Sequence, residues 1–168
     1  MPFILPAGLW ARIASSVTMS DSSSLYRVSI YTAALGIIRH YWVTGIGIGA
    51  FNQIYPLFSF EAANAYHAHN LFLQEFIELG IVGFAVLVLL LLFFFQRLYS
   101  GMRTAPKRFR FLLGAIFGGF AGLLLQGLTD HLWFDYRIVL FFWCFIGIGM
   151  ATVRVAEKKG ERETEEMK

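Results

Sequence analysis

The chain has 168 residues, of which 57% are hydrophobic and 17% aromatic, and its mean hydropathy is +0.60. Only 15% of the residues are charged, against about 25% in soluble globular domains, so the composition argues against a soluble helical bundle. The formal net charge is +3, but the basic residues are not gathered as a nucleic-acid-binding patch would require. The single cysteine excludes a disulfide within the chain.

The N-terminal part of the sequence is too polar and too short in its apolar runs to cross a membrane. Residues 1–10 are apolar but broken by prolines, and residues 14–24 form a serine-rich linker. Residues 24–42 then predict an amphipathic helix lying at the membrane interface. Its apolar residues recur at helical spacing, and N-cap candidates precede it: Val28, Tyr31, Leu35, Ile38 and Trp42, after Asp21, Ser22 and Ser23.

A glycine-rich segment, TGIGIGAF, follows at residues 44–51. Gly45, Gly47 and Ala50 formally match the dinucleotide fingerprint G-x-G-x-x-A, but that fingerprint must follow a strand, and here a helix precedes it. We therefore predict a tight turn, poor in side chains, that lets the backbone approach another element. Residues 51–65 continue as an aromatic loop that contains Tyr55.

Three apolar runs, at residues 81–95, 111–128 and 138–153, are free of charged side chains. With their flanks they reach the roughly 17–25 residues that a membrane span requires. The predicted fold class is an all-α integral membrane protein with about three transmembrane helices, near residues 70–96, 111–128 and 137–153. An extracytoplasmic amphipathic helix and loop would precede them, and the whole would be the C-terminal part of a larger polytopic bundle.

The segment between the first two spans, residues 96–110, sets the expected orientation. It reads as a loop with five basic residues and no acid, which the positive-inside rule places in the cytoplasm. Residues 1–69 would then be an extracytoplasmic loop, residues 70–153 the membrane domain, and residues 154–168 a solvated cytoplasmic tail, frayed or weakly helical. Trp133 and Tyr136 would lie at the outer interface.

Nothing in residues 1–69 could carry them across a membrane, because no signal peptide or span is visible there. We therefore expect further membrane segments ahead of residue 1, so that the chain is a fragment or a truncated gene product. The alternative is that the N-terminal segment follows the later helices across without a signal of its own.

This topology gathers all four histidines and several charged residues on the extracytoplasmic side: Arg27, Arg39, His40, His67, His69, Glu75, Glu78, Asp130, His131, Asp135 and Arg137. His69 precedes Asn70, a good N-cap residue, so its ring can lie over the mouth of the first membrane helix. A histidine there can take a proton from a hydroxyl group and release it later. The competing interpretation is a histidine that is hydrogen-bonded to loop backbone.

The spacing His67-x-His69 also occurs in metal sites, with Glu75, Asp130 or His131 as further ligands. A catalytic zinc ion needs three protein ligands, and no third ligand is fixed by spacing, so we predict no metal.

Arg27 is expected in the first turn of the amphipathic helix. Free backbone N–H groups favour an anion there, and a guanidinium group binds phosphate through two hydrogen bonds. The alternative is an arginine that reaches lipid head groups.

Asn70, Gln74 and Glu78 are spaced by four residues and should share one inward face of the helix. Alternatively, Glu75 and Glu78 only complement the helix N-terminus. Two sets of glycines are expected to allow close helix packing, namely Gly80 with Gly83, and Gly114 with Gly118 and Gly122. Asp130 and Asp135 receive no role.

The stretch His69-Asn70, nine residues, then Gly80-Ile81-Val82-Gly83 resembles the H-N-x9-G-x-x-G signature of the O-antigen ligase and polymerase superfamily. The upstream residues that match the family's pattern are Arg27, Tyr31, Gly45, Gly47, Gly49, Phe51 and Tyr55. Tyr31 stands where a tryptophan is more usual. The likeness covers about residues 8 to 150.

This resemblance implies a glycosyltransferase of polysaccharide and lipopolysaccharide biosynthesis, a multi-pass protein of the bacterial cytoplasmic (inner) membrane with its site on the extracytoplasmic face. Its partners would be an undecaprenyl-diphosphate-linked glycan, an acceptor glycan or glycolipid, and the lipid bilayer, with no metal or other cofactor. His69 matches the family's essential histidine and Arg27 an essential arginine. His67, Asn70, Glu78 and Tyr55 would support the substrates or the catalytic groups.

Family members are usually longer, and a second essential arginine lies in an earlier loop that this chain lacks. The alternative function is therefore a non-catalytic membrane module, either a truncated relic or a half that needs N-terminal helices on a partner chain. Transport is less well supported, because charges within the spans would then be expected.

Overall fold

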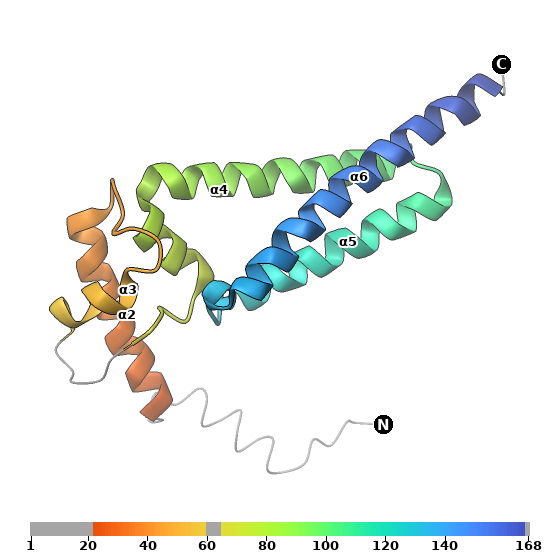
Figure 1. Cartoon of the computed structure of the whole chain (residues 1–168). Helices are drawn as coiled ribbons and strands as arrows, with labels where there is room; N and C mark the ends of the chain where they lie inside the picture. The colour runs from red at the N-terminus through yellow and green to blue at the C-terminus, as the bar shows by residue number, and fades with distance from the viewer. Residues whose placement is uncertain (1–21, 60–64, 167–168) are drawn as a thin grey trace, which may run out of the picture.

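The computed structural model describes residues 22–59 and 65–166, and all regular elements in this part of the chain are helical (Figure 1). The elements in chain order are α2 (Ser22–Tyr41), α3 (Phe51–Ile54), a 3-10 turn (Tyr55–Leu57), α4 (Leu71–Thr104), α5 (Lys107–Gln126), a second 3-10 turn (Leu132–Phe134) and α6 (Tyr136–Glu166). Asp21, an expected N-cap residue, and the segments 1–10 and 14–21 lie outside the described residues.

Three of these helices are long and apolar enough to cross a membrane, at residues 71–104, 107–126 and 136–162. The prediction of an all-α membrane protein is therefore confirmed. The helices pack on one another around phenylalanine rings, with Phe120 centred 4.8 Å from Phe94 of α4 and 5.2 Å from Phe142 of α6. Much of their remaining surface is apolar and exposed, as at Leu89, Leu92, Phe93, Phe141 and Phe145, which suits contact with lipid.

The prediction of a basic loop over residues 96–110 is wrong about the length of the loop, because only residues 105–106 separate α4 from α5. Packing continues α4 beyond Gln96: Leu98 is fully buried, and Arg97 donates two hydrogen bonds of 3.0 Å to the Glu157 carboxylate of α6. Pro106 then stands just before the first turn of α5, where a missing N–H costs little. Helix α6 in turn continues through most of the segment expected to be a tail.

The glycine-mediated packing expected on α5 is not found within residues 22–59 and 65–166. A side chain at Gly118 or Gly122 would meet open space, and one at Gly114 would meet only the sulfur of Met102. Close approach between the long helices occurs instead at other glycines: a Cβ atom on Gly101 would press on Val153 and Leu113, one on Gly149 on the Phe94 ring, and one on Gly160 on the backbone of Thr104.

Helix α2 packs mainly through residues outside the predicted apolar set, of which only Tyr31 and Ile38 pack against the buried core. Ile30, Ala33, Ala34 and Ile37 are buried, at the i, i+3, i+4, i+7 spacing of one helix face, and form a core with Phe51, Tyr55 and Ile77. Val28, Leu35 and Trp42, from the predicted set, are exposed at 44%, 56% and 53%. The helix is therefore apolar on both faces, one packed and one open.

The glycine-rich turn joins this small helical unit to α4. Helix α4 is interrupted at Gly80, whose φ of 64° and ψ of −178° only glycine adopts readily. There the backbone of residues 42–47 lies directly against the backbone of residues 77–81, and we call this contact the glycine clasp. Its three backbone hydrogen bonds run from Ile46 N to Ile77 O (3.0 Å), from Gly47 N to Glu78 O (3.0 Å) and from Ile81 N to Trp42 O (2.8 Å). The predicted close approach of this turn to another element is thus confirmed.

Candidate functional site

The start of α4 is fixed by Asn70, which is its N-cap as predicted. The Asn70 side chain accepts a hydrogen bond from Leu73 N at 2.9 Å and donates one to Leu128 O at 2.9 Å, while Leu71 N donates to Gly127 O at 2.7 Å. The cap satisfies a free helical N–H group, and the other two bonds attach the α5–α6 loop to α4. Residues 127–131 are thereby placed beside the His67–Asn70 segment.

His69 has a left-handed backbone conformation, with φ at 48°, and no other non-glycine residue in the described ranges does. Such a conformation is uncommon for a side chain of this size and persists only where surrounding contacts fix it. The two bonds of Asn70 and the ring of Tyr26, packed edge-on against the His69 ring at 6.3 Å, provide those contacts. The His69 ring consequently has a defined position over the mouth of α4.

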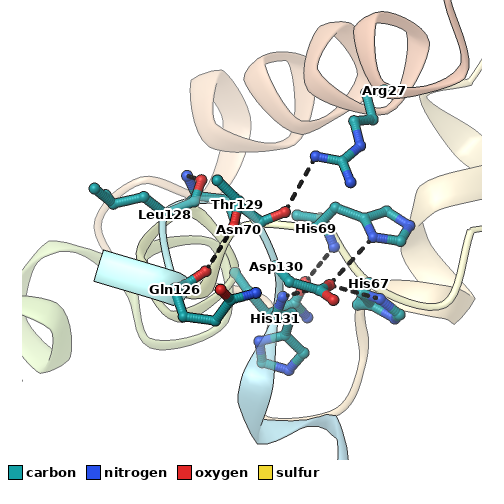
Figure 2. A network of polar contacts seen from close by, with 11 residues as sticks. Arg27, His67, His69, Asn70, Gln126, Leu128, Thr129, Asp130 and His131 are labelled. Carbon is teal, nitrogen blue, oxygen red and sulfur yellow. Dashed lines mark hydrogen bonds and ion pairs between the residues drawn. The ribbon is translucent and has the colours of Figure 1, made fainter. Parts of the chain in front are cut away.

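Asp130 is the centre of the polar cluster (Figure 2). Its Oδ1 atom lies 3.3 Å from His69 Nδ1 and 3.7 Å from His67 Nε2, and it accepts a 2.8 Å hydrogen bond from His131 N. The rings of His67 and His69 are centred 4.3 Å apart, and the His131 ring lies 5.7 Å from that of His67. Three of the four histidines therefore gather around one carboxylate.

The electrostatics of this cluster keep Asp130 ionised. Burial opposes its ionisation, but the hydrogen bonds from His131 N and His69 outweigh burial and lower the pKa of Asp130. Burial, with the nearby charge of His69, lowers the pKa of His67 despite the opposing effect of Asp130. Burial is also the main cause that lowers the pKa of His131 to about 4. At neutral pH the cluster thus holds a carboxylate beside a neutral His67 and a neutral His131.

Arg27 reaches the same cluster from α2, although not in the way expected. It lies in the second turn, five residues after Ser22, so the expectation that it sits beside the free N–H groups of the first turn is wrong. Its Nη1 instead donates to Thr129 O at 3.1 Å, one residue from Asp130 (Figure 2). The remaining guanidinium N–H groups have no protein acceptor within the described residues.

One ring nitrogen each of His67 and His69 and a carboxylate oxygen of Asp130 lie within 4.8 Å of one another, close enough to hold one metal ion. Two imidazole nitrogens and a carboxylate oxygen are ligands that zinc accepts. Of the further ligands considered from sequence, Asp130 joins this group, whereas Glu75 and His131 do not.

Glu78 and Gln74 form a second polar group, one helical turn further along α4. Gln74 Nε2 donates to Glu78 Oε1 at 2.6 Å, Gly49 N donates to Glu78 Oε2 at 2.9 Å, and Ala68 N donates to Gln74 Oε1 at 2.8 Å. Both side chains are buried, which confirms that they face inward. Glu78 therefore ties the glycine-rich turn to α4.

The other residues singled out from sequence lie apart from the cluster. Tyr55 is completely buried in the α2–α3 core, beside Phe51. His40, the fourth histidine, bonds to Gly36 O of its own helix and packs on Phe58. Asp135 pairs with Arg137 at 2.8 Å.

Thr129 is a site residue that sequence reasoning missed, and Asp130 was considered only as a possible metal ligand and not as the partner of His69. The available signal was topological: the loop after the second span returns to the side on which the first span begins. No spacing in the sequence could say which of its polar residues meets His69, because the contact joins positions 61 residues apart.

Comparison with known proteins gives one match, to the family model described as O-Antigen ligase, over residues 3–88. The match covers just over half of the chain. The chain belongs to the O-antigen ligase family. The matched residues include Arg27, His67, His69 and Asn70, whereas Asp130 lies beyond them. No curated protein and no solved structure matches the chain. Family membership and the three spanning helices together make this a multi-pass membrane protein of surface polysaccharide biosynthesis.

Proposed function

We propose that this O-antigen ligase family member transfers a glycan from an undecaprenyl-diphosphate carrier to a hydroxyl group of an acceptor glycan or glycolipid. The observation that carries the proposal is the convergence of His69, Asp130 and Arg27 from three segments at one end of the helices. The α4–α5 turn, which is flanked by basic residues in the last turns of α4 and the first turn of α5, lies at the opposite end of α4 (Figure 1). By the positive-inside rule this supports a site on the extracytoplasmic face of the bacterial inner membrane.

His69 is the proposed general base. In the tautomer that carries its proton on Nδ1, His69 donates to Asp130, and its Nε2 lone pair is free to accept a proton. The acceptor oxygen forms a bond to the anomeric carbon of the donor as its proton passes to Nε2. The bond from that carbon to the diphosphate oxygen breaks, and the electron pair leaves with the carrier diphosphate.

Arg27 is the proposed partner of that diphosphate. Only one of its N–H groups is committed to Thr129 O, so the others can donate to phosphate oxygens, which a guanidinium group binds through two hydrogen bonds. The charge on the leaving group rises as the glycosidic bond breaks. A fixed cation there favours the transition state over the bound substrate.

Asp130 is a positioning residue in this proposal, because it touches His69 rather than the reacting atoms. It holds the His69 tautomer and ring direction, and it stabilises the imidazolium that forms when Nε2 takes the proton. The hydrogen bond from His131 N fixes the carboxylate in turn.

The test is glycan transfer in membranes that contain the chain, with undecaprenyl-diphosphate-linked oligosaccharide as the donor and a panel of acceptor glycolipids. His69→Ala should lower the rate by about 10²- to 10⁴-fold, the range that general base catalysis contributes. His40→Ala is the matched control, because His40 lies on α2 outside the cluster, and it should transfer at the wild-type rate. Arg27→Lys should retain more activity than Arg27→Ala, since it keeps the charge.

Transfer by His69→Ala at the wild-type rate, with equal protein in the membrane, would exclude the proposed base. Loss of transfer in His40→Ala as well would mean that the substitutions act through folding. Wild-type membranes without transfer would favour the alternative, a non-catalytic membrane module that needs a partner chain.

A further inference from the structure

An open cavity of about 800 Å³ lies beside the histidine cluster, within the roughly 300–1,000 Å³ range of small-molecule sites. His67 and His131 form the wall nearest the cluster. Glu75 and Glu78 line it from α4, and Trp133 and Trp143 from the α5–α6 loop and α6. Arg27 is not among the lining residues, so the cavity is separate from the proposed diphosphate position.

His131 Nδ1 and Trp133 Nε1, which line this cavity, are buried without a hydrogen-bond partner in the described residues. A third polar group of the cavity without such a partner is the carboxyl group of Glu75. Glu75 is only 8% exposed, yet its carboxyl group forms no hydrogen bond with any residue in the described ranges. The neighbouring Glu78 carboxylate is satisfied by Gln74 and Gly49 N. A buried polar group without a partner is costly and uncommon in native structures. A ligand in the cavity with hydroxyl groups would provide the missing partner.

The chemistry of the walls specifies the kind of ligand. Within the described residues the cavity has no lysine or arginine, and it has two acidic side chains, so it disfavours an anion. Most of the remaining wall is aromatic or aliphatic, including Trp133, Trp143 and Leu87. A hydrocarbon chain would suit these walls but would leave Glu75 unpaired. A pyranose ring has both apolar C–H faces for the tryptophans and hydroxyl groups for the carboxyl group.

We propose that this cavity binds an uncharged sugar of the acceptor glycan, with Glu75 as the residue that hydrogen-bonds its hydroxyl groups. The inference deepens the proposed function and rests on it, because the bound sugar belongs to an acceptor only if the protein transfers a glycan. The two substrates would then meet at the histidine cluster from different directions. The anionic donor head group lies on the Arg27 side, and the neutral acceptor lies in the acidic cavity. His67 lies between the two binding positions, and its ring is centred 4.3 Å from the ring of His69.

Sugar binding can be measured without transfer, because Trp133 and Trp143 line the cavity and report on it by fluorescence. The protein in lipid nanodiscs, with Trp10→Phe and Trp42→Phe to remove the other two tryptophans, is titrated with glucose, galactose, N-acetylglucosamine and glucuronate. At least one neutral sugar should change the fluorescence saturably. Glucuronate should bind at least about 10-fold more weakly than that sugar, since its carboxylate faces two acids.

Three variants separate the role of Glu75 from general effects. Glu75→Leu should weaken binding of the neutral sugar by about 10-fold or more, because the hydrogen bonds are lost. Glu75→Gln keeps a donor and an acceptor and should stay within about threefold of wild type. Glu161→Gln, an exposed acid at the far end of α6, should leave binding unchanged.

The proposal is overturned if no neutral sugar changes the fluorescence, or if Glu75→Leu binds sugar as wild type does. It is also overturned if a polyprenol displaces the sugars or alone produces the response, since the cavity would then be a lipid site. Sugar binding by a protein that shows no transfer would refute the proposed function and leave the pocket intact. Transfer that depends on His69 but occurs without measurable sugar binding would refute the sugar pocket and leave the proposed function intact.

Discussion

The glycine clasp predicts that two glycines with nearly the same φ angle differ greatly in their tolerance of alanine. Gly45 and Gly49 have φ values of 67° and 74°, so an alanine at either pays the left-handed penalty of roughly 1–2 kcal/mol. A Cβ atom at Gly45 would collide with the backbone of Glu78 and Gly80, whereas one at Gly49 would meet nothing within 4 Å. Gly49→Ala therefore isolates the conformational cost.

The additional cost at Gly45 comes from opening the clasp. Backbone atoms cannot move aside as a flexible side chain can, so the two segments must separate and lose the three hydrogen bonds between them. At about 1 kcal/mol for each bond, added to the conformational penalty, Gly45→Ala should destabilise the contact by roughly 4–5 kcal/mol, against about 1–2 kcal/mol for Gly49→Ala. Gly80→Ala should behave like Gly45→Ala, since its Cβ atom would meet the backbone of Val43 and Gly45.

Amide hydrogen exchange in nanodiscs measures this difference locally. The reporters are the Ile46, Gly47 and Ile81 N–H groups, which donate across the clasp. Their protection should fall by more than about 100-fold in Gly45→Ala and by about 10-fold in Gly49→Ala, since each 1.4 kcal/mol is a factor of ten. Equal losses of protection in the two variants would refute the argument, because the left-handed conformation alone would then account for both.

Three further predictions concern the histidine cluster. Asp130→Asn should reduce transfer by about 10- to 100-fold, measured as kcat at saturating substrates, because loss of a charge-assisted hydrogen bond leaves the His69 tautomer unfixed. The folded-state pKa of His131 is lowered from 6.5 to about 4, so stability present above pH 6.5 should be lost as the pH falls toward 4. This loss is about 3 kcal/mol, and thermal unfolding of His131→Asn should show a shallower acid dependence. Chelators should leave transfer unchanged, whereas added zinc should inhibit it. A zinc ion bound to His69 Nδ1 would leave the proton on Nε2, which could then not act as the base. Inhibition by chelators would instead show that a metal ion takes part in the reaction.

The sequence predicted those features that depend on local pattern. The three spans follow from apolar length, the N-cap at Asn70 from its position before an apolar run, and the inward face of Gln74 and Glu78 from their spacing of four. The close approach of the glycine-rich turn was also predictable, because three glycines at alternate positions permit the left-handed backbone of a tight turn and leave room for another segment. Each of these depends on residues that belong to one continuous segment of the sequence.

The features that the sequence did not predict depend on contacts between distant segments. The continuation of α4 past Gln96 depends on Arg97 meeting Glu157, 60 residues away. The packed face of α2 was missed because both of its faces are apolar, and only the position of Phe51 and Ile77 decides which one is buried. The partner of His69 also depends on contacts between distant segments. The topology allows several acids to reach His69, and only the bonds from the start of α4 to Gly127 and Leu128 select Asp130.

These contacts also explain why the site should respond to changes far from its chemistry. The first two turns of α4 are held by the glycine clasp at one end and by the α5–α6 loop at the other. His69 and Asp130 belong to the second attachment, and Glu78 to the first. A shift of the α4 start relative to either attachment changes the distance from His69 to Asp130, and small displacements of catalytic groups are expensive. The clasp variants should therefore lower kcat as well as stability, even though Gly45 and Gly80 touch none of the reacting groups.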